Sequence, residues 1–230
     1  MTLLAGASGF SFASWRPGFY PAGTRSEEFL ALYAAALPTV EVNSTFYRQP
    51  QPVTFERWAA TVPDGFRFAV KAPRTISIFG RVDFAAEFCA RIRALGDRLG
   101  PVLVRLDERR DRDDDFLRAL LAAFDDDLWL ALDLRHPSWD GVESLLSERG
   151  AVRVNQLDSP APFRYLRFRE PPYDEAALRE WAERLRPLVD AGVCVHGYFR
   201  HEDAPTAPRY ALRLLSLVSA GAGGAAFSGP

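Results

Sequence analysis

The sequence predicts an α/β protein built as a single (β/α)8 TIM-type barrel of parallel strands. Apolar segments typical of buried strands occur eight times along the 230 residues, mostly separated by segments with helical periodicity. Polar side chains enter these segments repeatedly, as expected where barrel strands reach the mouth. Neither the G-x-G-x-x-G nor the G-x-x-x-x-G-K-[ST] fingerprint is present. An open doubly wound sheet is the main alternative, but strands in alternation with helices favour a closed barrel.

The expected elements follow the apolar pattern in chain order. Strands are predicted over residues 3–6, 39–43, 66–72, 101–107, 128–139, 151–158, 163–170 and 194–201. Helices are predicted after a capping box at Thr24 and Glu27, from Pro52, after a cap at Asp83, and at 116–124, around Leu145, at 174–190 and at 210–218. Proline and glycine set the expected helix ends: the first helix stops at Pro38, the third closes at Gly100, and Pro187 bends or ends the helix at 174–190.

Domain organisation follows from length and composition. With 48% hydrophobic and 25% charged residues, the chain can bury the core of one domain, expected over residues 1–219. The Gly/Ala-rich segment 220–230 is expected to be a flexible tail. The connection 7–23 is long for a compact domain, and its five aromatic residues indicate an ordered loop.

The net charge and the length of the apolar runs limit where the protein can reside and which partners it can bind. The formal net charge of −2 argues against a surface that generally coats nucleic acid or membranes. No apolar run approaches the roughly 20 residues of a membrane span, and the N-terminus lacks a basic segment followed by an apolar core. We therefore expect a soluble, cytoplasmic protein without membrane association. Cys89 and Cys194 are too few and too far apart for a disulfide scaffold or a cysteine zinc site, and both are expected in the core.

The segment 39–48 (TVEVNSTFYR) carries the clearest polar face near a strand end. Two valines alternate with Glu41 and Asn43, so these two polar side chains share one face of the strand. The aromatic residues Phe46 and Tyr47 follow where the chain leaves the strand. A carboxylate and an amide at a strand end pack poorly in a core, so their position favours a chemical role.

Other predicted strands carry polar residues at corresponding positions. Together with Glu41 they form a set of ten: Asn43, Lys71, Arg105, Asp133, Arg135, Arg167, Arg169, Tyr198 and Arg200. Six of the ten are cationic and two are anionic, so a mouth containing all of them would hold costly unpaired positive charge. An anionic ligand would balance it, because arginine suits phosphate and carboxylate groups. Internal ion pairs, such as Glu41 with Lys71 or Asp133 with Arg135, are the structural alternative.

Several collinear motifs resemble those of the DUF72 family, also called YecE-like proteins. The motifs are SGFSFASW, FYP, VEVNSTFYR, FRFAVKAPR, GDRLGPVLVRL, LRHPSW, DSP and YLRF, spread from about Leu4 to Ser219. The resemblance implies a TIM-barrel fold. It does not imply a reaction, because the biochemical function of the family is not established.

The resemblance also implies site residues. The family pattern marks Glu41, Asn43, Phe46, Tyr47, Lys71, Arg135, His136, Trp139 and Arg167. The chain departs from the pattern in four places. Arg105 to Glu108 replace a Gln-Leu-Pro-Pro run, Asp133 stands where Glu is common, Arg169 stands where His is common, and 198–201 replace a Tyr-Phe-Asn-Asn run. Three of these departures introduce arginine, as expected of a divergent member.

The leading hypothesis is an enzyme, either a hydrolase, a lyase or an isomerase, that acts on a small anionic substrate bearing phosphate or carboxylate. The candidate catalytic residues, as acid or base groups, are Glu41, Asp133 and His136. The candidate substrate-binding residues are Asn43, Tyr47, Lys71, Arg135, Trp139, Arg167, Arg169 and Tyr198. His136 precedes Pro137 and can instead order its loop.

Two alternatives belong to other classes. One is a nucleic-acid-binding or processing module that uses the cationic mouth and an aromatic rim. The other is a barrel that retains only ligand sensing. No cofactor is expected, and no metal site is expected because the three histidines, His136, His196 and His201, show no ligand spacing. The aromatic residues near the mouth either stack on a ring of the ligand or pack the first loop. The sequence makes no prediction of oligomeric state.

Overall fold

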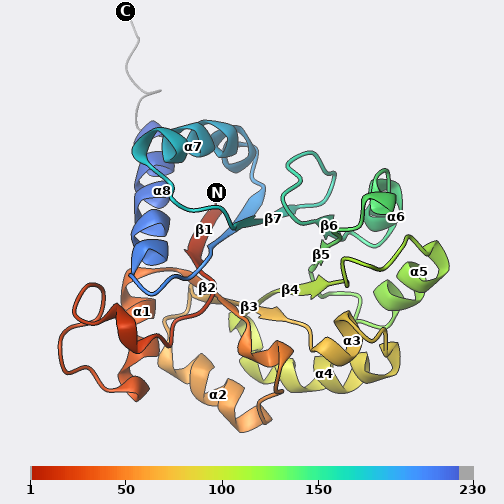
Figure 1. Ribbon diagram of the computed structural model, residues 1–230, viewed down its shortest axis with the longest axis horizontal. Helices are drawn as coiled ribbons and strands as arrows, with labels where there is room; N and C mark the ends of the chain where they lie inside the picture. The colour runs from red at the N-terminus through yellow and green to blue at the C-terminus, as the bar shows by residue number, and fades with distance from the viewer. Residues whose placement is uncertain (1, 223–230) are drawn as a thin grey trace, which may run out of the picture. The chain divides into compact units, whose positions relative to one another are not determined.

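A computed structural model describes residues 2–222, and strands alternate with helices along the chain (Figure 1). The strands are β1 (Thr2–Ala7), β2 (Thr39–Val42), β3 (Arg67–Lys71), β4 (Leu99–Arg105), β5 (Leu130–Asp133), β6 (Val152–Arg153), β7 (Phe163–Phe168) and β8 (Cys194–Phe199). The α-helices are α1 (Phe29–Ala36), α2 (Pro52–Thr61), α3 (Arg74–Ser77), α4 (Ala85–Ile92), α5 (Asp114–Ala122), α6 (Glu143–Glu148), α7 (Glu175–Asp190) and α8 (Thr206–Ala222). Short 3-10 helices are η1 (Ala13–Trp15), η2 (Ser26–Glu28), η3 (Ser44–Phe46), η4 (Val82–Phe84), η5 (Arg93–Arg98) and η6 (Pro137–Trp139).

The strands form one sheet in the order β6-β5-β4-β3-β2-β1-β8-β7. The strand pairs with a defined register are parallel. Every residue of β2, β5 and β7 is buried, as expected of parallel strands covered on both faces. The fold is therefore a (β/α)8 TIM-type barrel, as the sequence predicts. The contacts of the chain group it into two compact units, which are described separately below.

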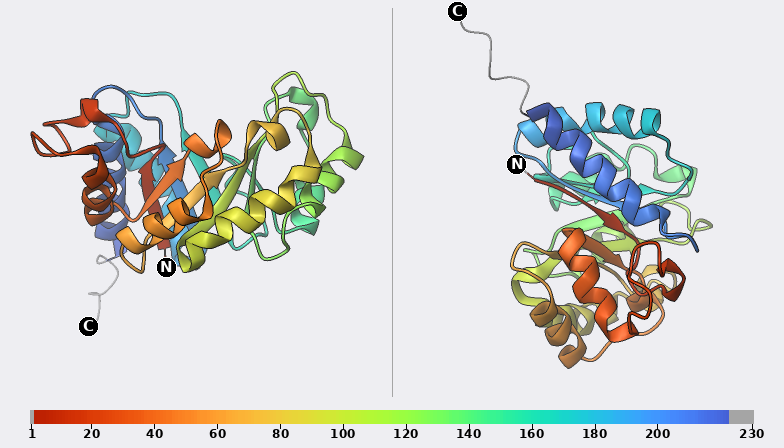
Figure 2. Two further views of the ribbon diagram at one scale, coloured as in Figure 1. Left: turned by 90° about the horizontal axis from the view of Figure 1, so that it is seen from below. Right: turned by 90° about the vertical axis from the view of Figure 1, so that its left-hand side faces the viewer.

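Among the described residues, unit 1 comprises 2–40 and 166–222. Within it β1 pairs with β8 along its whole length. The helices α7 and α8 lie side by side, and α8 packs on β1 (Figures 1 and 2). The amphipathic stripe of α7 buries Leu178, Leu185 and Val189, which explains why these residues recur at helical spacing.

A glycine is required where β1 approaches β2 in unit 1. A Cβ atom on Gly6 would lie 2.0 Å from the carbonyl oxygen of Thr39. The buried hydroxyl of Tyr33 joins the two strands at this point. It accepts a hydrogen bond from the Ala7 N–H at 2.7 Å and donates one to the Thr39 carbonyl at 2.9 Å. Helix α1 is thereby fixed to the start of β2.

The long first loop of unit 1 is ordered by buried aromatic residues. Trp15 and Tyr20 are fully buried, and Trp15 donates its indole N–H to the carbonyl of Glu202 at 3.0 Å. The ring of Tyr20 stacks on Phe29 of α1 with 4.4 Å between ring centroids. Of the two roles considered for these aromatic residues, packing of the loop is the one observed for Trp15 and Tyr20.

Unit 2 comprises residues 41–165 and holds β3 to β6 with α2 to α6. Helix α2 lies beside α4 and η5 (Figures 1 and 2). The β3–β4 pairing shifts register between Phe68 and Val70, which marks a bulge or irregularity near the middle of β3. The carboxyl ends of β2, β3 and β5 in this unit carry four of the candidate site residues: Glu41, Asn43, Lys71 and Asp133.

Several predicted boundaries in unit 2 are wrong, including that of the strand expected over 128–139, which is limited to Leu130–Asp133. The α-helix expected to close at Gly100 ends at Ile92 as α4. The 3-10 segment η5 follows and breaks at Gly96, whose φ of 52° and ψ of −135° are not helical, and Gly100 lies inside β4. The strand predicted over 151–158 is reduced to the two residues of β6. It ends because Asn155 adopts a positive φ of 66° and donates its N–H to the carbonyl of Tyr165 at 2.9 Å.

Other predicted ends in unit 1 also shift. The capping box is formed by Arg25 and Glu28 rather than by Thr24 and Glu27. Helix α7 contains Pro187 and continues to Asp190. Helix α8 is longer than predicted, so residues 220–222 of the predicted tail belong to it, and residues 223–230 lie outside the described part of the chain. Over residues 2–222, each helix is too short or too polar to cross a membrane.

Candidate active site

Glu41 and Asn43 meet at the carboxyl end of β2, as their spacing predicts. The Glu41 side chain is 0% exposed. The Asn43 amide donates to Glu41 Oε1 at 3.0 Å, and the hydroxyl of Tyr165 on β7 donates to Glu41 Oε2 at 2.9 Å. Asn43 is also the residue that leads into η3, so the chain turns directly beyond this group. These two donors reach different oxygens and orient the buried carboxylate.

Tyr165 is positioned by a buried arginine next to it in the sequence. Arg164 donates to the carbonyls of Leu157, Ala161 and Phe163 at 2.5 to 2.7 Å. Burial lowers the pKa of this guanidinium, against a smaller raising effect of Asp158. Arg164 therefore holds the segment before β7 in place through backbone carbonyls.

Lys71 lies at the end of β3 beside the turn that follows β2. The lysine is 7% exposed, and its Nζ atom lies 3.9 Å from the centroid of the Phe46 ring. The hydroxyl of Thr45 lies 2.7 Å from the carbonyl oxygen of Lys71 and 3.1 Å from that of Val42. Thr45 thus joins the ends of β2 and β3, and the aromatic ring faces a buried ammonium group.

Asp133 and Arg135 share a face at the end of β5 and form an ion pair. Arg135 Nε lies 3.2 Å from Asp133 Oδ1, and Nη2 lies 3.4 Å from Oδ2. Arg105 at the end of β4 lies 3.7 Å from Glu108. The structural alternative weighed for Asp133 and Arg135 is therefore observed, and both arginines have a carboxylate neighbour.

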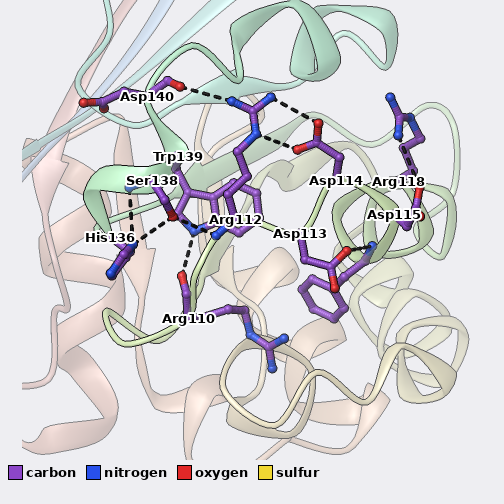
Figure 3. A network of polar contacts seen from close by, with 11 residues as sticks. Arg110, Arg112, Asp113, Asp114, Asp115, Arg118, His136, Ser138, Trp139 and Asp140 are labelled. Atoms are coloured by element: carbon purple, nitrogen blue, oxygen red, sulfur yellow. Dashed lines mark hydrogen bonds and ion pairs between the residues drawn. The ribbon is translucent and has the colours of Figure 1, made fainter.

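His136 belongs to a separate polar network in the loop after β5 (Figure 3). Its Nδ1 atom lies 2.8 Å from Ser138 Oγ and accepts the Ser138 N–H at 3.3 Å, while Nε2 lies 3.3 Å from Asp111. Trp139 is fully buried and donates its indole N–H to the carbonyl of Arg110 at 3.0 Å. His136 thus orders its loop, which is the alternative considered above, and Trp139 anchors it.

The remaining candidates divide between the units. Arg167 and Tyr198 are buried in unit 1, where the Tyr198 hydroxyl lies 2.9 Å from Thr39 Oγ1 and 3.2 Å from His196 Nδ1. Arg169 donates to Ser8 Oγ at 3.3 Å. In unit 2, Tyr47 is 77% exposed. No group of three or more histidine, cysteine or acidic residues suited to a metal ion occurs among residues 2–222.

Tyr165 was not among the predicted site residues, although the sequence contains a signal for it. It alternates with Arg167 and Arg169 along the strand 163–170, and side chains two apart share a face. Its bond to Glu41 joins residues 124 positions apart in the chain, a contact that periodicity cannot predict.

These observations define a TIM-barrel protein whose strand ends carry a buried carboxylate, a half-buried amide, a buried hydroxyl group and a buried ammonium group. The family described as "Protein of unknown function DUF72" matches residues 4–227, and the chain belongs to it. The UPF0759 proteins YecE of Escherichia coli O157:H7 and strain K12 are both 32% identical to the chain, over 168 and 169 residues. These matches cover 68% of this chain, which spans 59% of the length of each relative.

Solved structures of the family support the fold. A DUF72 family protein from Thermotoga maritima MSB8 matches with a TM-score of 0.82 and 22% identity, covering 95% of this chain and 100% of that one. A DUF72 family protein from Enterococcus faecalis V583 matches with a TM-score of 0.75 and 18% identity, covering 94% and 95% of the two chains.

Proposed function

We propose that this protein is an enzyme that transfers a proton to or from a small anionic substrate, with the Glu41 carboxylate as the acid or base. The observation that carries the proposal is the way in which Glu41 is held. Tyr165 and Asn43 each donate one hydrogen bond to a different oxygen of a fully buried carboxylate. Fixed donors orient a carboxylate for proton transfer, and the carboxyl ends of the strands are where TIM-barrel enzymes carry their catalytic groups.

The anionic character of the substrate is supported by Lys71. A buried ammonium attracts a phosphate or carboxylate more strongly than an exposed one, because the surrounding dielectric constant is low. Its carbonyl is tied through Thr45 to the turn that follows Glu41, so the two groups come from adjacent strand ends of unit 2. Arg135 is a second cation at a strand end of unit 2, and its Nε atom lies 3.2 Å from Asp133 Oδ1.

Glu41 is preferred over the other two candidate catalytic residues. Asp133 is engaged by the guanidinium of Arg135, with 3.2 Å between Nε and Oδ1. His136 is engaged by Ser138 and Asp111 in an ordered loop. Substrate-binding roles for Asn43, Tyr47, Trp139, Arg167, Arg169 and Tyr198 stay predictions. Hydrolysis, elimination and isomerisation all require the proposed proton transfer.

A thermal-shift screen tests the proposal. Wild type, Glu41→Gln and the control Glu56→Gln, which changes an exposed glutamate of α2, are compared. The compounds are sugar phosphates, sugar acids, nucleotides and short oligonucleotides. A ligand that binds the native state raises the midpoint as its concentration increases.

The expected result is a small anion that stabilises wild type and Glu56→Gln and is turned over by both, while Glu41→Gln binds it without turnover. Equal turnover by Glu41→Gln would refute the role of Glu41. Stabilisation that requires oligonucleotides of increasing length would favour the nucleic-acid alternative. Binding without turnover by the wild type would favour ligand sensing.

A further inference from the structure

A cavity of about 360 Å³ lies in unit 2, among the segments that follow β2 and β3 and the start of α4. Its volume is within the range of small-molecule sites. Its lining includes Phe46, Tyr47, Gln49, Arg74 and Thr75. We call it the β2–β3 pocket. It adjoins the candidate active site, because the ring of Phe46 lines the pocket and also contacts the Lys71 ammonium at 3.9 Å.

Two buried polar atoms in the lining of this pocket have no hydrogen-bond partner. Seven side-chain nitrogen or oxygen atoms of the described residues are buried and unpartnered, and five of them are Nε atoms of arginines. The other two are Gln49 Oε1 and Thr75 Oγ1. Native proteins satisfy nearly all such atoms, so two in one pocket indicate partners supplied from outside the chain. The hydroxyl of Thr75 can donate or accept, and an amide can do either after a flip.

The charges in the lining leave one cation available. Glu87 is bonded by Arg91 at 2.6 Å, and Arg91 also donates to Gln51 at 3.3 Å, so this group is internally satisfied. Arg74 is exposed, and its guanidinium lies 5.1 Å from the centroid of the Phe79 ring. No ion pair joins Arg74 to a carboxylate within residues 2–222. The pocket therefore presents a positive charge at its edge.

The aromatic residues supply a stacking surface. Tyr47 is largely exposed, and its ring meets that of Phe46 edge-on with 5.1 Å between centroids. An exposed aromatic face beside groups that need hydrogen-bond partners suits a ring with apolar faces and hydroxyl groups at its edge.

We propose that the β2–β3 pocket binds a polyhydroxylated ring that carries an anionic group, such as a sugar phosphate or a sugar acid. Hydroxyl groups of the ring satisfy Gln49 and Thr75, the ring packs on Tyr47, and the anion pairs with Arg74. The proposal rests on the proposed function in that it names the class of the small anionic substrate.

Isothermal titration calorimetry tests this assignment with four probes: glucose 6-phosphate, glucuronate, glucose and inorganic phosphate. The variants Gln49→Leu, Thr75→Val and Arg74→Gln change the pocket, Glu41→Gln changes the carboxylate, and Arg57→Gln on the exposed face of α2 is the control. We expect one of the two charged sugars to bind wild type and Arg57→Gln. We expect each pocket variant to weaken that binding by about tenfold or more. Arg74→Gln should remove the preference for the charged sugar over glucose.

The unliganded variants provide a second readout. A substitution that removes an unpartnered buried polar atom and keeps the shape of the side chain should leave the unliganded protein as stable as wild type or more stable. Gln49→Leu and Thr75→Val should therefore lose binding without losing stability, which a structural role would not produce.

Failures of the two proposals are distinguishable. Binding unchanged in all three pocket variants, or no binding of any probe to wild type, overturns the pocket assignment. Binding that is lost in the pocket variants and kept in Glu41→Gln supports the pocket assignment. If Glu41→Gln also turns over the same probe as fast as wild type, the catalytic role of Glu41 is refuted while the pocket assignment stands.

Discussion

The end of β2 and the loop after β5 each contain a carboxylate with a side-chain partner, but the two groups differ in burial. Around Glu41, the carboxylate and the Tyr165 hydroxyl are both fully buried. Around His136, the acidic partner Asp111 is 83% exposed. Ser138, which Figure 3 shows beside His136, is exposed as well. Because water competes for exposed polar groups, the second network contributes little energy for each contact. The first group is costly to bury and costly to disturb, which is typical of side chains retained for chemistry.

The largest effect is expected at Trp139, the one fully buried side chain of the loop network in Figure 3. Trp139→Ala removes a large core side chain and leaves the Arg110 carbonyl without its indole donor. We expect a loss of about 3–5 kcal/mol of unfolding free energy, measured by urea denaturation. Trp139→Phe should lose clearly less. If Trp139→Ala were nearly neutral, the loop would not be anchored as described.

The next effect is expected at Tyr165. Tyr165→Phe keeps the ring and removes the donor to Glu41 Oε2 in a buried site. The expected destabilisation is about 1–3 kcal/mol, because the buried carboxylate loses a hydrogen bond. Tyr47→Phe, which removes the hydroxyl of an exposed ring, is the matched control and should change stability by less than about 0.5 kcal/mol. Equal effects of the two variants would mean that burial does not distinguish the regions.

A small effect is expected at Asp111. Asp111→Asn weakens the 3.3 Å contact with His136 Nε2 in an exposed site. The change in unfolding free energy should stay below about 1 kcal/mol and shrink as salt is added. A larger, salt-independent loss in denaturation experiments would show that the loop network matters as much as the buried group.

The smallest effect is expected at an exposed pair between α7 and α8 in unit 1. The hydrogen bonds from Arg213, at 2.8 Å from its Nε atom, are the main reason that the pKa of Glu175 is lowered from 4.5 to about 2. A lowered folded-state pKa stabilises the protein above the unfolded value, and this contribution is lost as the pH falls from 4.5 toward 2. In acid-denaturation curves Glu175→Gln should lack this part of the pH dependence, whereas Glu180→Gln should match wild type.

The barrel could be predicted from the sequence because its strands are continuous apolar segments and its helices have regular stripes. The end of the helix before β4 could not, because Gly96 and Gly100 are both plausible terminators and only the observed φ of Gly96 separates them. Glu41 and Asn43 meet through a hydrogen bond of 3.0 Å, although Asn43 lies one residue beyond β2, where the chain already turns into η3.

Contacts between segments that are far apart in the sequence could not be predicted. Nothing in the sequence brings Asp111 to His136 or Tyr165 to Glu41, since each contact depends on how two loops or strands are placed in space. Gln49 lies in a connection and Thr75 in the four-residue helix α3, so no periodic pattern marks either residue. The burial of their polar atoms in one pocket became visible only from the structure.

Proton exchange catalysed through Glu41 is the most direct test of the proposed function. Glucose 6-phosphate and glucuronate, and any compound that stabilises the protein in the screen, are incubated in deuterated water with wild type, Glu41→Gln and Glu56→Gln. Proton NMR follows deuterium incorporation and product formation. We expect Glu41→Gln to slow the reaction by about 10²–10⁴-fold, whereas Glu56→Gln should match wild type. Equal rates for wild type and Glu41→Gln would contradict this expectation.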